Sequence, residues 1–341
     1  MSRSRIAVIG SGSWGTTLAC MLARSGRATT LLVRSEDEAS SLRSAGENVR
    51  YLPGVRFPLQ LAISGDRARA LRNAQVILLA VPSQTMRANA TAIEPHVSTD
   101  AAVLSCAKGL EQGTLARMTQ VIAEELSVGP ERVGTLSGPN IAREISEGKP
   151  AVSVIATNGP EVSRTARAVL TTPHFRVYTG DDVVGVELAG ALKNIIALGA
   201  GIADGMQAGD NAKAAFMTRG LAEISRLGMA LGAHPLTFAG IAGIGDLIAT
   251  CASPHSRNRR LGQALAEGMT LQAAQAKLGQ VAEGVTTVST ARDLARQHGV
   301  EMPITEQLHA ILFEGKEPPQ AIVELMQRDV KHELDGLAGL H

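Results

Sequence analysis

The sequence predicts an α/β fold, in which a doubly wound sheet with helices on both faces is followed by an all-helical domain. Three observations carry this prediction. The apolar run Ile6–Ile9 shows no alternation, as expected of a strand buried on both faces, and a glycine-rich turn follows it at once. Apolar strands alternate with helical stretches as far as Tyr178. From about Asp181 onward the strand signal disappears, so we expect domains of residues 1–180 and 181–341.

The glycine-rich turn contains Gly10, Gly12 and Gly15 in G-x-G-x-x-G spacing, between that strand and a helix expected over Thr16–Ser25. In a Rossmann unit the first glycine permits the tight turn, the second lets backbone amides approach a pyrophosphate, and the third lets helix and strand pack closely. The helix N-terminus adds positive potential for that anion. The alternative is a loop that merely needs positive φ angles. Because a second apolar strand, Thr29–Val33, completes a βαβ unit, the stretch predicts a dinucleotide-binding Rossmann domain.

Arg34 directly follows that second strand, where a Rossmann fold meets the adenosine ribose of its cofactor. An Asp or Glu there would bind the 2′-hydroxyl of NAD, whereas an Arg accommodates the 2′-phosphate of NADP. Arg34 therefore favours NADP(H), with NAD(H) as the other candidate cofactor. The alternative interpretation is a solvated Arg before an acidic helix start at Glu36–Glu38.

Further buried strands extend the sheet, and a connecting loop with turns is expected over Asn48–Pro58, where Pro53 and Gly54 interrupt any periodicity. One strand ends directly before Lys108. A Lys at the carboxyl end of a parallel strand faces the ligand crevice, although surface lysines also follow strands. The strands expected after the loop are Val76–Val81, Val103–Ala107, Val133–Leu136, Val152–Ala156 and Phe175–Tyr178.

The C-terminal part reads as successive helices joined by small-residue connectors, with a frayed tail expected from Asp335. Small residues at Gly199–Gly201 and Gly228–Gly232 indicate helices that approach closely, within the chain or between the subunits of a homodimer. The expected helices are Val183–Ala203, Ala212–Leu231, Arg257–Glu267, Leu271–Lys277, Thr286–His298, Ile304–Phe313 and Pro318–Gln327.

Composition excludes several classes of protein. A formal net charge of +1 and only 2% aromatic residues argue against a nucleic-acid partner. The three cysteines, Cys20, Cys106 and Cys251, share no metal-type spacing and read as small core residues in a reducing compartment. The eight histidines include no H-x-x-H or H-E-x-x-H pattern, so no metal site is expected.

The ends and apolar runs of the chain indicate a cytoplasmic protein. Met1–Arg5 runs straight into the first strand and leaves no room for a signal peptide. The longest apolar run, Val183–Ala203, is interrupted by Glu187 and Lys193, so stable membrane insertion is not expected.

Lys193 is a candidate for proton transfer because burying an ammonium group in an otherwise apolar helix is costly. Desolvation suits an amine to proton transfer, while a nearby carboxylate keeps it charged. Asp246 is the one acid in Gly240–Leu247, which we expect to be a flexible loop, and it is the candidate partner that orients Lys193. The alternatives are a Lys193 that reaches solvent or pairs with Glu187, and an Asp246 that caps a helix over residues 247–250.

A candidate phosphate site lies in Ser256–Arg260, which reads Ser-Arg-Asn-Arg-Arg and offers three guanidinium groups and two neutral donors at a helix start. It could equally be a solvated basic turn. Glu283, in Val281–Gly284, is an acid at the start of a helix. Its spacing alone does not assign it a role.

Jointly, these motifs resemble, in order and over nearly the whole chain, those of bacterial-type NAD(P)-dependent glycerol-3-phosphate dehydrogenase. The resemblance implies a Rossmann domain, an all-helical domain of the 6-phosphogluconate dehydrogenase C-terminal type, and an active site between them. It also implies reversible reduction of dihydroxyacetone phosphate to sn-glycerol 3-phosphate, the precursor of glycerophospholipids. The motifs are residues 10–16, 107–111, 137–142, 192–194, 243–247 and 256–259.

The resemblance also assigns roles. It implies that Lys193 donates and accepts the proton, that Lys108 touches both cofactor and substrate, and that Asp246 lies in the substrate pocket beside the chemistry. At Asn140 the family often has Ser or Thr, and an amide also donates to a phosphate or hydroxyl. Implied substrate contacts are Lys108, Gly138, Asn140, Lys193, Asp246, Ser256, Arg257 and Asn258. Implied cofactor contacts are Gly10, Gly12, Ser13, Trp14, Gly15, Arg34, Lys108, Ala142, Arg257, Val281 and Glu283.

We therefore expect NADPH to deliver a hydride to the carbonyl carbon while Lys193 protonates the developing alkoxide, without a metal. Arg257, Asn258 and the backbone at Gly138 would hold the substrate phosphate. Two alternatives stay open. One is another two-domain dehydrogenase, of the 2-ketopantoate reductase or 6-phosphogluconate type, and the other is a catalytically silent NADP-binding sensor.

Overall fold

The computed structural model describes residues 5–279, 281–329 and 332, and the chain forms two compact units. Unit 1 runs from the first strand to Lys108 and from Ala116 to Val183, and unit 2 comprises Gly109–Leu115 and the chain from Val184 onward. The short segment Gly109–Leu115, which the sequence places in the first domain, belongs to unit 2, where Leu110 is buried in the helical core. The tail expected to fray from Asp335 lies outside the described residues.

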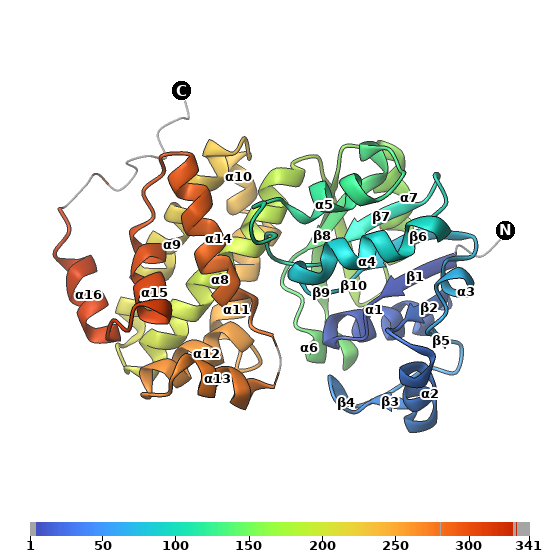
Figure 1. Cartoon of the computed structure of the whole chain (residues 1–341), viewed down its shortest axis with the longest axis horizontal. Helices are drawn as coiled ribbons and strands as arrows, with labels where there is room; N and C mark the ends of the chain where they lie inside the picture. Colours follow the sequence, from blue (N-terminus) through green and yellow to red (C-terminus); the bar gives the residue numbers. More distant parts are fainter. Residues whose placement is uncertain (1–4, 280, 330–331, 333–341) are drawn as a thin grey trace. The chain divides into compact units, whose positions relative to one another are not determined.

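Unit 1 is built on an eight-stranded sheet of order β10-β9-β8-β7-β6-β1-β2-β5 (Figure 1). From β5 to β8, the strands follow the order 3-2-1-4-5-6 of a Rossmann sheet, and β9 and β10 extend the sheet beyond β8. This order confirms the predicted fold. The direction changes at β9, which pairs antiparallel with β8 and parallel with β10. The strands are β1 (Arg5–Ile9), β2 (Ala28–Leu32), β5 (Ala62–Ser64), β6 (Ala74–Leu79), β7 (Ala102–Ser105), β8 (Val133–Ser137), β9 (Ala151–Thr157) and β10 (Phe175–Gly180).

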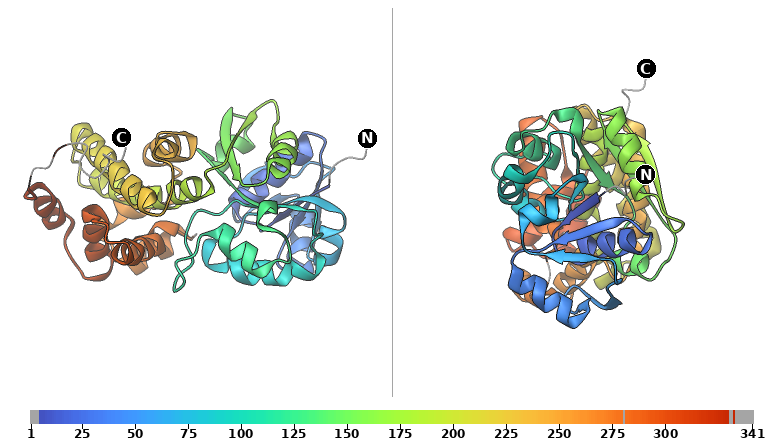
Figure 2. Two further views of the ribbon diagram at one scale, coloured as in Figure 1. Left: turned by 90° about the horizontal axis from the view of Figure 1, so that it is seen from above. Right: turned by 90° about the vertical axis from the view of Figure 1, so that its right-hand side faces the viewer.

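Helices cover both faces of this sheet, which explains why β1 lacks alternation (Figure 2). Ile6 and Val8 pack in a core with α1, α2, α6 and α7, whereas Ala7 and Ile9 pack in a core with α3, α4 and α5. The helices are α1 (Ser13–Arg24), α2 (Glu36–Ala45), α3 (Arg67–Leu71), α4 (Met86–Ile93), α5 (Met118–Glu125), α6 (Ala142–Ser146) and α7 (Pro160–Leu170).

The prediction of a connecting loop over Asn48–Pro58 is wrong in part. A small antiparallel pair forms there from β3 (Glu47–Asn48) and β4 (Leu52–Arg56). The strands are short, and Gly54 has a φ of +77° inside β4, so neither strand shows a periodic pattern in the sequence. The pair positions the buried Asn48, whose side chain contacts the glycine-rich turn.

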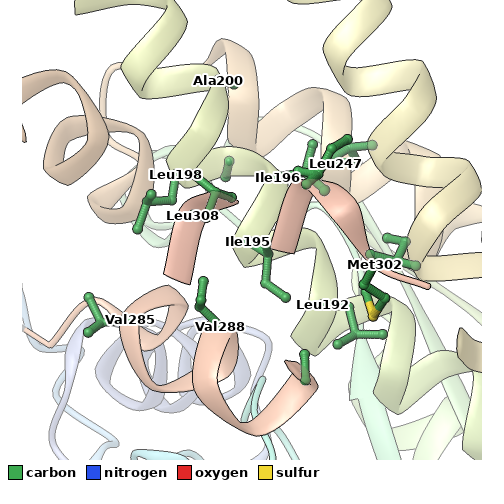
Figure 3. Close-up of a cluster of buried hydrophobic side chains, with 14 of the residues drawn as sticks. Leu192, Ile195, Ile196, Leu198, Ala200, Leu247, Val285, Val288, Met302 and Leu308 are labelled. Atoms are coloured by element: carbon green, nitrogen blue, oxygen red, sulfur yellow. The ribbon is translucent and has the colours of Figure 1, made fainter. Parts of the chain in front are cut away.

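Unit 2 is helical and surrounds the long, mostly buried helix α8 (Val183–Gly205). Its core joins α8 to α11, α14 and α15 (Figure 3). By length and composition alone, Val183–Gly205 and Pro235–Ala252 could each cross a membrane, but the core helix of a protein can pass the same test. The most apolar 18-residue window is 83% buried in Val183–Gly205 and 33% buried in Pro235–Ala252. The other helices are α9 (Asp210–Ala230), α10 (Pro235–Phe238), α11 (Asp246–Ala252), α12 (Arg257–Ala266), α13 (Leu271–Leu278), α14 (Glu283–Gln297), α15 (Pro303–Phe313) and α16 (Pro318–Met326).

The small residues of unit 2 bring helices together within the chain. A Cβ at Gly199 would lie 2.1 Å from the Phe216 ring, and one at Gly201 would lie 1.9 Å from the carbonyl oxygen of Arg259. Gly228 approaches the ring of Phe238 in the same way. These glycines therefore serve the packing of α8 and α9 inside unit 2.

The prediction of a flexible loop over Gly240–Leu247 is wrong. Ile241–Gly245 forms a π-helical turn that leads directly into α11 at Asp246. Gly243 sits against the backbone of Phe238, where a Cβ would lie 2.1 Å from the carbonyl oxygen. Glycines therefore permit close packing here and not mobility, so Asp246 stands on an ordered helix start.

The three cysteines are buried, as the sequence predicts. Burial raises the pKa of Cys20 to about 11 and that of Cys251 to about 12, and it also raises the pKa of Cys106. A thiol with a raised pKa carries little thiolate at neutral pH, so these side chains behave as small apolar core groups.

Candidate functional site

The glycine-rich turn has the geometry that pyrophosphate binding needs. Gly10 has a φ of +106°, and a Cβ at Gly15 would lie 2.0 Å from the carbonyl oxygen of Gly10, so both positions require glycine. A Cβ at Gly12 would meet nothing within 4 Å, so space lies open over this residue. Helix α1 starts directly after it with no side-chain cap and no acid in its first turn. The residues present therefore fit a dinucleotide phosphate at the helix N-terminus.

The turn is anchored from outside by Asn48. Its Nδ2 donates to the carbonyl oxygen of Ser11 at 2.7 Å and to Oγ1 of Thr16 at 2.9 Å. Thr16 also donates to the Ser11 carbonyl, at 3.3 Å. Asn48 is absent from the sequence-based site because it falls in the stretch interpreted as a loop, and no local pattern marks this contact.

The cofactor-side residues after the turn differ in their surroundings. Ser13 and Trp14 are half-buried in the first turn of α1, and the Trp14 ring lies 6.3 Å from the ring of Phe175. The side chain of Arg34 is 80% exposed beyond the end of β2, with Nε 3.7 Å from Oε2 of Glu38. Trp14 thus also packs inside unit 1, while Arg34 lies at the surface beside an acid.

The carboxyl ends of β7 and β8 bring Lys108 and Gly138 together. The Lys108 ammonium donates to the carbonyl oxygen of Gly138 at 2.8 Å. Gly138 has a φ of +151°, and a Cβ there would lie 3.0 Å from the backbone of Ser153. The hydroxyl of Ser137, at the end of β8, is buried without a hydrogen-bond partner, so this sheet edge holds an unsatisfied polar group.

Asn140 and Ala142 follow the same sheet edge. The Asn140 side chain donates to the carbonyl of Val152 at 3.2 Å and accepts from Ser153 Oγ at 2.7 Å, so its amide is held by β9. Ala142 begins α6, and its carbonyl accepts from Thr17 Oγ1 of α1 at 3.2 Å. This bond ties α6 to the helix that follows the glycine-rich turn.

In unit 2, Lys193 and Asp246 form a buried ion pair. Nζ lies 3.0 Å from Oδ1, and the two residues are 4% and 2% exposed. Thr250 completes the group, because its hydroxyl accepts from the Lys193 ammonium and donates to Asp246 Oδ1 at 3.1 Å. Sequence reasoning missed Thr250, although its (i, i+4) spacing from Asp246 on a helix is the signal that places both on one face.

The basic stretch after α11 is only partly available for a phosphate. Ser256 caps α12 by accepting from the Arg259 amide at 3.3 Å, and the Arg259 guanidinium is paired with Asp204. Of the three guanidinium groups that this stretch offers, that of Arg259 joins α12 to α8 through Asp204. Arg257 and Arg260 are the exposed basic side chains of this stretch.

Asn258 links this stretch to the start of α14. Its Oδ1 accepts from the amide of Gly284 at 3.0 Å, which leaves Nδ2 as the donor atom of the side chain. A Cβ at Gly284 would lie 2.9 Å from the carbonyl oxygen of Asn194, the neighbour of Lys193. Glu283 begins α14 and Val281 is 54% exposed. The elements that carry Lys193, Asn258 and Glu283 therefore meet within unit 2.

Neither the large cavity of unit 2 nor a metal-type cluster involves these residues. A cavity of about 1130 Å³ in unit 2 lies among α8, α9, α15 and α16, and none of the site residues expected from the sequence lines it. Among the described residues, no group of three or more His, Cys, Asp or Glu side chains could hold a metal ion.

Comparison with known proteins gives one family for both parts of the chain. The family model described as NAD-dependent glycerol-3-phosphate dehydrogenase N-terminus matches residues 5–163, and the model for the C-terminus matches residues 182–323. Glycerol-3-phosphate dehydrogenase (NAD(P)+) of Streptomyces griseus is 49% identical over 329 residues, which cover 96% of this chain and 98% of the relative.

Solved structures agree with this match. The glycerol-3-phosphate dehydrogenase of Coxiella burnetii has a TM-score of 0.91 and 39% identity, covering 96% of this chain and 99% of the other. A ketopantoate reductase of Ralstonia eutropha has a TM-score of 0.59 and 18% identity, covering 93% and 99%, so it shares the fold alone.

Proposed function

The chain belongs to the family of NAD-dependent glycerol-3-phosphate dehydrogenases, and we propose that it catalyses the reversible reduction of dihydroxyacetone phosphate to sn-glycerol 3-phosphate with NAD(P)H. The observation that carries the chemistry is the buried pair of Lys193 and Asp246. An ammonium group that is held in an apolar helix and paired with a carboxylate is oriented and charged, as a proton donor to an alkoxide must be.

In this proposal NAD(P)H, when bound, supplies the hydride. Lys193 donates a proton to the carbonyl oxygen as negative charge develops there, and in the reverse direction it accepts the proton from the hydroxyl. Asp246 and Thr250 hold the amine in place. Lys108, whose ammonium donates to the Gly138 carbonyl, is a further residue that we propose to contact both cofactor and substrate.

The substrate phosphate would be held by donors rather than by a metal. Arg257 supplies a guanidinium, and Asn258 supplies Nδ2 in an orientation fixed by the Gly284 amide. Gly138, Asn140 and Ser256 are the further substrate contacts that we propose. Binding energy from the phosphate then orients the carbonyl for the chemical step.

On the cofactor side, the turn from Gly10 to Gly15 binds the pyrophosphate, and Arg34 favours NADPH over NADH. The remaining cofactor contacts that we propose are Ser13, Trp14, Lys108, Ala142, Arg257, Val281 and Glu283. The ligands are small molecules, and no nucleic-acid partner or membrane insertion is part of the proposal. Sn-glycerol 3-phosphate would supply glycerophospholipid synthesis in the cytoplasm.

We also propose a homodimer. The close glycine contacts of α8 and α9 are used within the chain, so they do not mark the interface. Light scattering of the purified protein would give the molar mass, and a mass near 35.6 kDa would contradict the dimer.

The test of the activity is the loss of NADPH absorbance when dihydroxyacetone phosphate is added. Turnover is expected with this ketone and not with 2-ketopantoate. The Lys193→Ala variant should lose turnover while its affinity for NADPH stays near that of the wild type. A wild-type protein that binds NADPH without oxidising it would instead be a silent dinucleotide sensor, and turnover of 2-ketopantoate would assign the other dehydrogenase class.

A further inference from the structure

Glu38 joins the glycine-rich turn to the end of β2. Its Oε1 accepts from the Ser11 hydroxyl at 2.5 Å, and its Oε2 accepts from the Arg34 amide at 3.2 Å and lies 3.7 Å from the Arg34 guanidinium Nε. The Glu38 side chain is only 24% exposed, whereas that of Arg34 is 80% exposed. One carboxylate thus accepts two hydrogen bonds and forms one ion pair with the two segments that meet at the ribose corner of a Rossmann fold.

The neighbouring acids of α2 do not reach this corner. Glu36 accepts from the Arg43 guanidinium at 2.7 Å and from the Gly65 amide at 2.9 Å, on the side of the helix that faces β5. Asp37 is exposed. The three acids share the first turn of α2, but Glu38 is the one with a bond to the turn between β1 and α1.

The two nicotinamide dinucleotides differ at this corner. The 2′-hydroxyl of NADH donates a hydrogen bond that a carboxylate accepts. The 2′-phosphate of NADPH is an anion and needs cationic or neutral hydrogen-bond donors. A phosphate near Arg34 competes with Glu38 for the same guanidinium, and the two negative charges repel each other. Arg34 and Glu38 therefore act in opposite directions on the choice of cofactor.

We propose that Glu38 is a specificity-determining residue, whose carboxylate holds Ser11 and Arg34 and weakens the binding of the 2′-phosphate, so that the protein accepts NADH beside NADPH. This inference rests on the proposed use of NAD(P)H. An Arg at this position favours NADPH fully only when no neighbouring carboxylate is paired with its guanidinium. Arg34 alone therefore does not decide the choice of cofactor.

The test compares Glu38→Gln with Asp37→Asn, which removes the same charge from the same helix turn without touching the turn at Ser11. Dissociation constants are measured by calorimetry for NADPH and NADH, and for 2′,5′-ADP and 5′-AMP, which carry the ribose corner with and without the 2′-phosphate. Glu38→Gln should tighten NADPH and 2′,5′-ADP by about tenfold relative to NADH and 5′-AMP, the effect of one charge contact. Asp37→Asn should leave both ratios within about twofold, since exposed charges are screened.

Glu38→Asp is the second variant, because it keeps the charge while shortening the reach to Ser11, and it should shift the ratios toward NADPH by a smaller factor. If Glu38→Gln does not fold, this variant decides alone. Ratios equal to those of the wild type in Glu38→Gln, or in Glu38→Asp when it stands alone, would overturn the inference. Failure of the proposed function is seen separately, as a wild-type protein that binds both dinucleotides without turnover of dihydroxyacetone phosphate.

Discussion

The side-chain nitrogen of Lys193 lies 3.0 Å from Oδ1 of Asp246, and both residues are almost completely buried. Bulk water solvates neither charge, so each charge is stabilised by the other and by the Thr250 hydroxyl between them. A buried ion pair contributes little net stability compared with apolar residues of the same volume. Its presence here is better explained by the proton transfer that the proposed reaction requires.

The Asp246→Asn variant should therefore lose both activity and stability. Without the carboxylate, the amine is neither oriented nor favoured in its charged form, and kcat should fall by roughly 10²–10⁴-fold, the usual contribution of a positioned proton donor. Breaking one side of a buried pair should cost roughly 3–5 kcal/mol of unfolding free energy. Stopped-flow turnover and urea unfolding measure the two effects. Near-normal kcat in the Asp246→Asn variant would contradict the assigned pair.

Replacing Thr250 should affect the pair more mildly. Thr250→Val removes the bridging hydroxyl at nearly constant volume, and losing a hydrogen bond to a charged group, worth about 1.5–3 kcal/mol, corresponds to a loss of roughly 10–100-fold in kcat. Thr250→Ser restores the hydroxyl and should recover most of the rate. Because Thr250 acts through Lys193, KM for NADPH should stay constant while the pH profile of kcat changes. Equal kcat in the Val and Ser variants would exclude the positioning role.

The glycine-rich turn allows binding and folding to be separated. A Cβ at Gly12 meets nothing in the structure, so Gly12→Ala should fold with a nearly unchanged melting temperature. It should still raise the Kd for NADPH by about tenfold or more, because the added methyl occupies the space that the pyrophosphate needs. Gly15→Ala is the matched contrast, since its Cβ would lie 2.0 Å from the Gly10 carbonyl and should lower the melting temperature. Unchanged NADPH affinity in Gly12→Ala would place the pyrophosphate elsewhere.

The parts that the sequence predicts well are those in which neighbouring residues act together. The strand Ile6–Ile9, the turn and helix α1 are contiguous, so their pattern is complete within a short window. Lys193 is conspicuous for the same reason, because its apolar neighbours surround it in the sequence. The direction of β9 is not encoded in such a pattern, since an apolar strand reads alike in both directions.

The parts that the sequence misses depend on contacts between distant segments. Asn48, Glu38 and Thr250 each form side-chain bonds to residues far away in the chain, and a single sequence gives no distance between them. The sequence favours a loop before Asp246, where the structure has a π-helical turn, because glycine has low helix propensity. The glycines instead allow the turn to pack against Phe238, a tertiary reason that outweighs propensity.

Glu223 is a buried acid of α9 that bonds to the start of α15 and has no part in the proposed chemistry. Its carboxylate accepts from the amides of Ile304 and Thr305, each at 2.9 Å, and from the Thr305 hydroxyl at 2.8 Å. Glu223→Gln replaces one acceptor by an NH2 group that faces a backbone donor, so unfolding free energy should fall by about 1–3 kcal/mol. Turnover at a temperature well below the melting transition should stay unchanged.

The pH dependence of this loss has a definite sign. Burial raises the pKa of Glu223 above its usual value of 4.5, in spite of the three hydrogen bonds that lower it. The folded protein therefore binds this proton more tightly than the unfolded chain, and the resulting stability is complete below pH 4.5 and declines as the pH rises through the raised pKa. Urea unfolding at a series of pH values should show the advantage of the wild type over Glu223→Gln shrinking as the pH rises. Asp293→Asn, at an exposed acid of α14, is the matched control for the loss of one carboxyl group. An advantage that grows with pH would mean that the hydrogen bonds outweigh burial and that Glu223 is held in its charged form.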